Sequence, residues 1–478
     1  MKVCCLSHLA SADAPTGAEH SLALLARGLS RRGHHVEITA PGPWSLEKGL
    51  ATAGIEVQQI PVRVCWLVQS ETQPLVSQIA RAIRYGLPDS GERAISSWLE
   101  RRRPDIVHVN CLPHLRAAKA SHRLGLPVVW HLREILPPGP RRRWFARRLQ
   151  RYASKIVAVS AAVAGWVDDE GLGDRVRVVH NAVQVPTTIP SRGDARRKLD
   201  LPADVPVVGL YSQLVPHKGG PDFVRAAHDL ASKHPLAHFV IAGRGESGFV
   251  AALRRAANDG PAAERIHLLP PQPTIWPLLA ATDVVAVPTT WPDPLPRVVM
   301  EAMASGLPVA AYDGGGVPEM ISDGETGVLA ASGDVTALAG GIGRLLADDA
   351  LREQMGESAR ERAQRLFTVD GHVKAMEQVL AVMKCEMGAV HLFDENSEVL
   401  RLEVWRGLPA EAITQATAVP MGQGLVSWVY ERGEPVIVPQ VVAGKRRLLA
   451  FPADDDQASA GAPMRTKGQT LGGLSIIA

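Results

Sequence analysis

Two acidic residues frame the segment DPLPRVVMEAMASGLPV, residues 293–309. Asp293 comes just before a short helical pattern and Glu301 lies inside it, where residues 298–300 and 302–303 are all apolar. No exposed helix face is left for the Glu301 carboxylate, and burying an ionised group without a partner is costly. Glu301 must therefore meet either a fixed internal donor or a ligand. A carboxylate can accept hydrogen bonds from two hydroxyl groups of a sugar ring, so the segment favours a ligand.

A lysine next to a helix start gives a second candidate site. In GLYSQLVPHKGGPDFVRAAHDL, residues 209–230, a strand ends at Tyr211, a loop carries Lys218, and Gly219 and Gly220 lead into a helix. A cation beside the positive end of a helix favours an anion. The alternative is a solvated loop lysine with no ligand.

The pattern at residues 16–39 predicts a helix that begins at a close-approach glycine. Thr16 and Glu19 have capping-box spacing, and Gly17 leaves room for a phosphate at the backbone N–H groups of the first turn. Many helices begin in this way without binding a ligand, and that alternative stays open.

The glycine pattern after the strand HFVIAG is typical of a dinucleotide-binding site. Gly243, Gly245 and Gly248 in HFVIAGRGESG have the G-x-G-x-x-G spacing. The next strand, RIHLLP, is followed by no acid that could hold a ribose, so we do not expect NAD binding. Residues 314–316, GGG, follow another strand and predict a further close-approach loop.

Two series of strands and helices position these residues. The predicted strands of the first series are KVCCLSHL, HHVEITA, IEVQQIPV, DIVHVN, PVVWHL, KIVAVS and RVRVVHNAV. Those of the second series are VPVVGLYSQ, HFVIAG, RIHLLP, DVVAVPTT, PVAAYDG and GVLAA. Short apolar strands that alternate with amphipathic helices indicate parallel sheets covered on both faces. The predicted fold class is α/β, with two doubly wound Rossmann-like domains facing a cleft.

The connection and the C-terminal part have different patterns. Residues 183–206 are rich in proline and polar residues and predict a linker. Residues 388–407 predict a strand pair around a polar turn within a small α+β piece, and residues 444–463 predict a loop. The expected domains are 1–185, 186–365 and 384–478, with a connecting helix at 366–383.

Composition bounds the class of protein. The chain has 478 residues, of which 46% are hydrophobic and 21% charged, with a net charge of +3. No segment is long and apolar enough to predict a membrane span, and the N-terminus predicts a first strand rather than a secretory signal. Five scattered cysteines without metal spacing indicate a reduced, cytoplasmic protein.

One segment is strongly basic. Residues 139–155 carry six arginines and one lysine, with Phe145, Leu149, Tyr152 and Ile156 in one apolar stripe. Such a helix could lie on an anionic membrane at the inner face, or its stripe could pack on its own domain and leave the arginines solvated. Nucleic-acid binding is not expected, because no basic surface with interleaved aromatic residues recurs.

Together, these motifs resemble the retaining glycosyltransferases of the GT-B fold, family four, over residues 1–383. Members of that family have an acid-x7-acid motif, a helix EAMA.G.PV, then GG.PE and DG.TG. Here these stand as Asp293 to Glu301, EAMASGLPV, GGVPE and DGETG. The order of all four motifs is far more specific than any one of them.

The resemblance implies roles at the matching positions. Glu301 would hold the ribose hydroxyls, Asp293 would contact the donor sugar and Lys218 would neutralise the diphosphate. His131, in VVWHLRE, matches a family histidine that touches the donor sugar. The catalytic residues implied are Lys218, Asp293, Glu301 and His131, and the donor-binding residues are Gly17, Gln213, Gly243, Arg244, Leu295, Arg297, Val298 and Glu301. No metal site and no cofactor beyond the nucleotide-sugar substrate are implied.

The chain departs from the family pattern at three positions. Asp293 stands where glutamate is usual, Gln213 replaces an arginine of the GRL..KG pattern, and Pro296 stands where glycine is often found. The substitution at Gln213 removes one cation from the diphosphate site, which Arg297 or Arg244 would have to replace.

Residues 384–478 resemble a GAF domain, in VPMGQGLVSWVYERGEPVIV and APMRTKGQTLGGLSIIA. The piece is short for such a domain, and its first helix is shared with the end of the transferase, so we expect a partial domain that is structural or vestigial and does not sense a ligand.

The function implied is transfer of a sugar from a nucleotide-sugar to a hydroxyl of a glycan or lipid-linked acceptor, with retention. One alternative is a non-catalytic, degenerate transferase fused to a GAF-like sensory module. Another is an epimerase or phosphorylase on the same fold. Acceptor contacts are expected in loops 61–90 and 133–143.

Overall fold

A computed structural model describes residues 1–13, 15–65, 85, 89–382, 387–406, 413–414, 416–438, 459–466 and 469–477. The chain divides into two compact units, Met1–Glu377 and Gln378–Ala478. The division falls close to the predicted start of the C-terminal piece.

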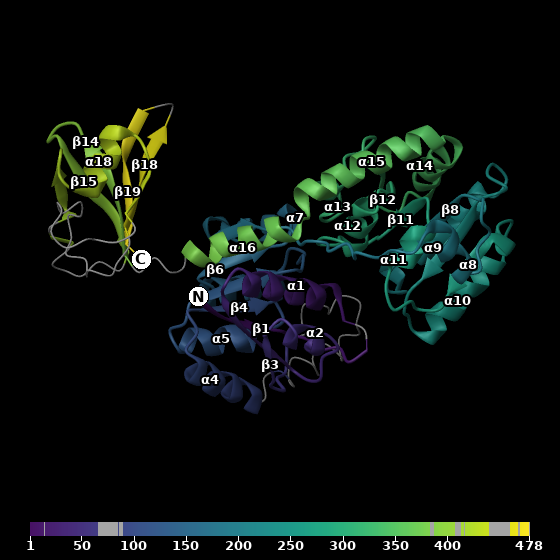
Figure 1. The fold of residues 1–478 in the computed structure, drawn as a ribbon, viewed down its shortest axis with the longest axis horizontal. Coiled ribbons are helices and arrows are strands. Elements are labelled where there is room, and N and C mark those ends of the chain that lie inside the picture. The colour runs from purple at the N-terminus through teal and green to yellow at the C-terminus, as the bar shows by residue number, and fades with distance from the viewer. Residues whose placement is uncertain are drawn as a thin grey trace. The chain divides into compact units, whose positions relative to one another are not determined.

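The first unit begins with a seven-stranded sheet of order β3-β2-β1-β4-β5-β6-β7, in which all neighbouring strands are parallel. Its strands are β1 Lys2–Leu6, β2 His35–Ala40, β3 Glu56–Gln59, β4 Ile106–Asn110, β5 Val128–Leu132, β6 Lys155–Ala158 and β7 Val176–Val178. The helices are α1 Gly17–Arg31, α2 Glu47–Ala51, α4 Ser90–Arg102, α5 Leu115–Arg123, α6 Pro140–Tyr152 and α7 Ala161–Asp168, with a 3₁₀ turn η2 at Gly173–Arg175. Every strand predicted in this series is present. We call this part the N-terminal domain (Figure 1).

A second parallel sheet follows, of order β10-β9-β8-β11-β12-β13. Its strands are β8 Val207–Tyr211, β9 His238–Ala242, β10 Ile266–Leu269, β11 Val284–Val287, β12 Val309–Asp313 and β13 Gly327–Ala331. Its helices are α8 Arg192–Lys198, α9 Gly220–Leu230, α10 Ser247–Asn258, α11 Trp276–Ala281, α12 Arg297–Ala304, α13 Val317–Met320, α14 Val335–Ala347 and α15 Asp349–Leu366, with 3₁₀ turns η3 Pro216–Lys218 and η4 Ala263–Arg265. We call this part the C-terminal domain. The two doubly wound sheets confirm the predicted fold class.

Strand order reverses between β1 and β4 in one sheet and between β8 and β11 in the other. In doubly wound sheets, ligands bind outside the carboxyl ends of the strands at these reversals. The loops that leave β1, β8 and β11, together with the helices α1, α9 and α12 that follow them, carry eight of the eleven predicted site residues.

The predicted linker is partly wrong, because residues 183–206 contain helix α8. Arg196 on α8 is 1% exposed, and its guanidinium donates to the Asp283 carboxylate at 2.9 Å and to the Ala281 carbonyl at 3.0 Å. Asp283 lies 87 residues from Arg196 in the chain. The polar local sequence therefore does not show that this segment forms a helix packed on its domain.

The basic segment forms α6, and its apolar stripe packs inside the N-terminal domain. Phe145 and Leu149 are fully buried, and Arg142 is buried with ion pairs to Asp169 and Glu170 at 2.8 and 2.9 Å. The structure therefore favours the packed alternative for the stripe. Arg143, Arg147 and Arg151 are the arginines of this helix that are exposed.

Helix α16, Val369–Val382, follows α15 and corresponds to the predicted connecting helix. It lies beside α1, where Arg32 forms ion pairs with Asp370 and Glu377 at 2.8 and 2.9 Å (Figure 1). A Cβ added at Gly28 of α1 would come within 2.2 Å of a Val373 methyl group, so the two helices are in tight contact.

The second unit holds a six-stranded antiparallel sheet of order β16-β15-β14-β19-β18-β17. Its elements are β14 Met387–Asp394, β15 Val399–Arg406, β16 Ala418–Pro420, α18 Gly424–Arg432, β17 Val436–Val438, β18 Ser459–Thr466 and β19 Gln469–Ile477. The predicted strand pair is confirmed as β14 and β15. The predicted loop 444–463 is wrong at its end, because residues 459–463 pair with β19 as part of β18; residues 444–458 lie outside the described residues.

Within the described residues, no helix is both long and apolar enough to cross a bilayer. Cys4, Cys5 and Cys111 are buried free thiols, and Cys65 is also buried, whereas Cys385 lies outside the described part of the chain.

Candidate functional site

A cavity of about 630 Å³ lies within the first unit and is lined by residues of both Rossmann-like domains. Pockets for small ligands typically measure about 300–1,000 Å³. Ten residues predicted from the sequence line it: Gly17, Gln213, Lys218, Gly243, Arg244, Asp293, Leu295, Arg297, Val298 and Glu301. We call this cavity the cleft.

Glu301 lies on α12 and is 6% exposed. Its carboxylate accepts a hydrogen bond at 2.6 Å from Nε of Arg297, one helical turn earlier, so the chain does supply an internal donor. Burial raises the pKa of Glu301, and the Arg297 charge and hydrogen bond oppose that rise. The pair stabilises an ionised carboxylate at the wall of the cleft, where a ligand hydroxyl could also donate to it.

Lys218 and Asp293 meet in the cleft from two different loops. Nζ of Lys218 lies 2.5 Å from the Asp293 carboxylate. Lys218 ends the 3₁₀ turn before α9, and Gly219 follows with φ of +74°. A Cβ at Gly219 would come within 1.8 Å of the Pro288 carbonyl oxygen. Glycine is thus required at residue 219, where the lysine loop crosses the loop after β11.

The glycine triplet 314–316 packs against the Asp293 loop. A Cβ at Gly315, whose φ is +60°, would come within 2.1 Å of the Asp293 carbonyl oxygen. The N–H of Gly316 donates to the same oxygen at 2.8 Å. The close approach predicted for these glycines is therefore made by the chain's own backbone, which fixes Asp293 in position.

The N-terminus of α1 faces the cleft through Thr16, Gly17 and Ala18. The Glu19 carboxylate is fully buried and accepts from the Thr16 N–H at 2.7 Å, as the predicted capping box requires. It also accepts from the N–H and the hydroxyl of Ser11, both at 2.8 Å. These bonds hold the loop before α1, so that the first N–H groups of the helix are presented to the cleft.

Three protein-family models match the chain. Residues 16–182 match the glycosyl transferase 4-like domain, residues 191–362 match glycosyl transferases group 1, and residues 373–478 match a GAF domain. Residues 16–362 carry the two domains of a GT-B glycosyltransferase. We refer to Met1–Glu377 below as the GT-B region.

Relatives and solved structures agree with this assignment. A D-inositol 3-phosphate glycosyltransferase of Acidothermus cellulolyticus is 36% identical over 297 residues, 55% of this chain and 64% of the relative. The one of Corynebacterium glutamicum (strain R) is 35% identical over 200 residues, 40% of this chain and 48% of the relative. The chain thus spans about half to two thirds of the length of these relatives. Anabaena Alr3699/HepE, solved with UDP and glucose, is 24% identical with a TM-score of 0.66, covers 80% of this chain and 99% of that one, and shows the shared fold.

The glycines of the G-x-G-x-x-G pattern have a backbone role in the GT-B region. A Cβ at Gly243 would lie 1.7 Å from the Ser212 carbonyl oxygen, and one at Gly245 would lie 2.4 Å from that of Leu214. The loops after β8 and β9 therefore run in contact. This contact explains the first two glycines of the pattern without a dinucleotide.

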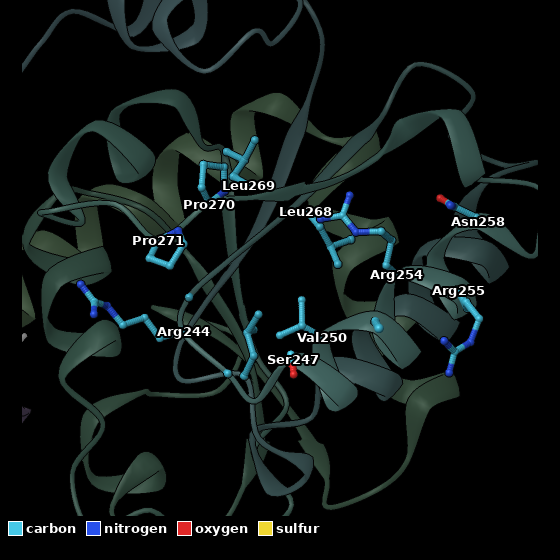
Figure 2. A pocket seen from close by; sticks show the side chains of 14 residues that line it. Arg244, Ser247, Val250, Arg254, Arg255, Asn258, Leu268, Leu269, Pro270 and Pro271 are labelled. Atoms are coloured by element: carbon cyan, nitrogen blue, oxygen red, sulfur yellow. The ribbon is translucent and has the colours of Figure 1, made fainter.

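A second cavity of about 1,120 Å³ adjoins the cleft, and Gly243, Arg244 and Pro271 line both. Figure 2 shows Arg254 and Arg255 on one side of it, Arg244 on the other, and Leu269 and Pro270 along its apolar wall. Arg244 is exposed, so its side chain can contact a ligand in either cavity.

His131 is the one of the eleven predicted site residues that is not among the residues lining the cleft. It is fully buried on β5, and its Nδ1 lies 3.2 Å from Nε2 of His108. Burial lowers the pKa of His131 well below its usual value, with Arg133 adding to the effect. Its Nε2 is buried without a hydrogen-bond partner among the described residues, and the contact with a donor sugar stays a prediction.

Sequence reasoning passed over two other residues that line the cleft from the N-terminal domain. Arg133, two positions after His131, donates to the Asn110 and Asn181 side-chain oxygens at 2.9 and 2.6 Å, and both Arg133 and Asn181 line the cleft. An arginine directly after a buried strand was the signal available in VVWHLRE.

Glu319, the glutamate of GGVPE, joins the two domains of the GT-B region. Its carboxylate accepts from the N–H groups of Ala161 and Ala162, in the first turn of α7, at 2.7 and 2.8 Å. Nε2 of His180 lies 3.2 Å from the same carboxylate. Burial would raise the pKa of Glu319, but the hydrogen bonds from His180 and the two backbone amides lower it overall.

The acceptor contacts expected in loop 61–90 fall mostly on residues that lie outside the described part of the chain.

Proposed function

We propose that the GT-B region transfers a sugar from a nucleotide-diphosphate sugar to an acceptor hydroxyl, with retention of anomeric configuration. The observation that carries the proposal is the cleft itself. It combines Lys218, Asp293 and Glu301 of the C-terminal domain with the helix start at Gly17 of the N-terminal domain. These are the groups needed to hold hydroxyls and a diphosphate at one place.

Each group has a role that its environment supports. Glu301 accepts hydrogen bonds from the ribose hydroxyls, with Arg297 as the second partner of the carboxylate. Lys218 exchanges part of its contact with Asp293 for the diphosphate, which leaves Asp293 to contact the donor sugar. The N-termini of α1 and α12 add favourable partial charge for an anion.

In the proposed reaction, the bond between the anomeric carbon and the diphosphate oxygen breaks and a bond from that carbon to the acceptor oxygen forms. The proton of the acceptor hydroxyl passes to the departing diphosphate, so no side chain is assigned as general base. Lys218 and the helix starts stabilise the charge that grows on the diphosphate. Closure of the two domains would exclude water and limit hydrolysis of the donor.

The nature of the two substrates is also a proposal. One protein of the same fold was solved with UDP and glucose, which supports testing uridine nucleotides first. The names of two relatives give inositol 3-phosphate as an acceptor class. We therefore propose that the acceptor is a glycan, a lipid-linked sugar or such a phosphorylated polyol.

Contact with an anionic membrane would depend on Arg143, Arg147 and Arg151. It would be ruled out if the protein ignored anionic vesicles at physiological salt.

The test is turnover of UDP-glucose, GDP-mannose and ADP-glucose with and without inositol 3-phosphate or a glycan acceptor, with product configuration followed by NMR. Transfer that depends on the acceptor, retains configuration and survives EDTA supports a retaining, metal-independent transferase. Sugar phosphate or epimer formed without acceptor would favour a phosphorylase or an epimerase. Binding without turnover would favour the non-catalytic alternative, which the departures at Gln213, Asp293 and Pro296 motivate.

A further inference from the structure

Arg133 is a cation in the wall of the cleft that no side-chain carboxylate neutralises directly. None of the ion pairs among the described residues involves it. Its guanidinium is held instead by the neutral amide oxygens of Asn110 and Asn181 at 2.9 and 2.6 Å. Neutral acceptors orient a guanidinium without cancelling its charge.

One nitrogen of this guanidinium is left over. Nη2 of Arg133 is buried and has no hydrogen-bond partner among the described residues. A buried donor without a partner costs free energy and calls for an explanation, such as an ion or a ligand that occupies the site. Arg133 lines the cleft, but Nη2 itself is buried, so contact with a ligand there requires a shift of the side chain.

The groups around Arg133 do not replace the missing partner. The adjacent Glu134 carboxylate accepts from the backbone N–H groups of Leu112 and Arg133 itself, at 3.1 and 2.9 Å. Burial lowers the pKa of His108 to about 3, with the Arg133 charge as the next cause, so this histidine is neutral near pH 7. Arg133 therefore remains the positive charge at this wall.

The opposite wall lacks a cation where the family has one. Gln213 lines the cleft in the place of an arginine. Of the two proposed replacements, Arg297 is paired with Glu301, and Arg244 is exposed and also lines the second cavity. We propose that Arg133 binds a phosphate-type oxyanion in the cleft through Nη2, supplying from the N-terminal domain the cation that Gln213 lacks. The inference rests on the proposed function. The oxyanion has two sources, the diphosphate of the donor and a phosphate on the acceptor.

The test is calorimetric titration of the full chain with UDP, GDP, ADP and inorganic pyrophosphate, on wild type, Arg133→Gln and Arg101→Gln. Arg101 is an exposed arginine of the same domain, on α4, and serves as the matched control. If Arg133 binds the donor diphosphate, Arg133→Gln weakens nucleotide binding by about 10-fold or more, as expected for loss of a charge-assisted hydrogen bond, whereas Arg101→Gln changes nothing.

A second arm distinguishes the source. If the nucleotide binds Arg133→Gln normally, inorganic phosphate is titrated into the nucleotide-saturated proteins. Loss of that binding only in Arg133→Gln assigns the site to an anionic acceptor. Arg133→Lys keeps the charge but not the geometry that fits Asn110 and Asn181, so it should bind the oxyanion with an affinity between those of wild type and Arg133→Gln. Melting curves of both variants would reveal a folding defect.

The outcome does not depend on the proposed function alone. If no nucleoside diphosphate binds wild type, the proposed donor site fails, but loss of pyrophosphate binding in Arg133→Gln would still support an oxyanion site. If wild type binds none of nucleotide, pyrophosphate and phosphate, or if a folded Arg133→Gln binds each of them as tightly as wild type does, the inference is overturned.

Discussion

At the scale of single residues, two pairs of opposite charge lie in the cleft. Lys218 meets Asp293 and Arg297 meets Glu301, each pair within hydrogen-bond distance. Such pairs keep ionised groups stable at a partly buried wall and can be exchanged for contacts to a ligand of matching charge. The departures from the family pattern change which cation is available, but not the presence of these pairs.

Lys218→Met should weaken binding of the nucleoside diphosphate by roughly 10- to 100-fold, the loss expected for a hydrogen bond between charged groups. The physical reason is that the variant removes the cation beside the α9 start and leaves Asp293 without its partner. Lys233→Met, which changes an exposed lysine of the same domain, is the matched control. Equal affinity of the two variants in calorimetry would contradict the role of Lys218.

The local pattern of α12 was enough to predict that Asp293, Arg297 and Glu301 lie close together, because Glu301 and Arg297 are one turn apart and the Asp293 loop precedes the same helix. Lys218 was predicted at an anion site from its own loop, whereas its pairing with Asp293, 75 residues away, was not predicted. Arg133 and Glu319 were passed over because their partners, Asn181 and the start of α7, are 48 and 158 residues away. A sequence match also did not show that β5 buries the side chain of His131.

At the scale of elements, glycines decide how closely the loops of the C-terminal domain can cross. Gly243→Ala should lower the melting temperature and the nucleotide affinity, because its Cβ would overlap the Ser212 carbonyl oxygen. Overpacking of this kind typically costs about 1–3 kcal/mol. Gly248→Ala is the matched control, since the nearest atom to its Cβ is 3.9 Å away. If both variants melted like wild type, the proposed backbone contact would be wrong.

Glu319 caps a helix of the other domain, so its loss should act on stability rather than on chemistry. Glu319→Ala should destabilise the GT-B region by about 1–3 kcal/mol, as expected for loss of a helix cap and its hydrogen bonds. Glu264→Ala, at an exposed position, should have no effect. Denaturant unfolding measures both.

The contribution of Glu319 should also depend on pH. Its pKa is lowered in the folded chain, so the stabilisation is present above the ordinary glutamate value of 4.5 and is lost as pH falls through the lowered pKa. The difference between wild type and Glu319→Gln should therefore shrink below that value. A difference that grew on acidification would contradict the assignment.

The elements of the fold were largely predictable, because parallel strands buried on both faces leave continuous apolar runs. Every strand predicted in the two Rossmann-like domains is present. Helix α8 was not predicted, since its packing depends on a buried ion pair between Arg196 and Asp283 that local sequence does not reveal. Likewise, Ser459–Pro463 pair with β19 although their local composition predicts a loop.

At the scale of the whole molecule, the GT-B region contains every residue that lines the cleft. A chain ending after Val382 should therefore bind the nucleotide with unchanged Kd. A chain ending after Thr368 should be less stable, because it loses the ion pairs of Arg32 and the contact of Val373 with Gly28. If the chain ending after Val382 bound the nucleotide more weakly than the full chain, the second unit would contribute to the site.

Calorimetric titration of wild type and Glu301→Gln with UDP, GDP and ADP measures whether the cleft binds a nucleoside diphosphate through Glu301. Burial raises the pKa of Glu301, which shows that the buried site disfavours the charged carboxylate. Replacement by the neutral glutamine should therefore leave the chain folded, as a melting curve would verify. We expect one nucleotide to bind wild type and to bind Glu301→Gln at least about 10-fold more weakly. Failure of all three to bind wild type, or equal binding by a folded Glu301→Gln, would contradict the account.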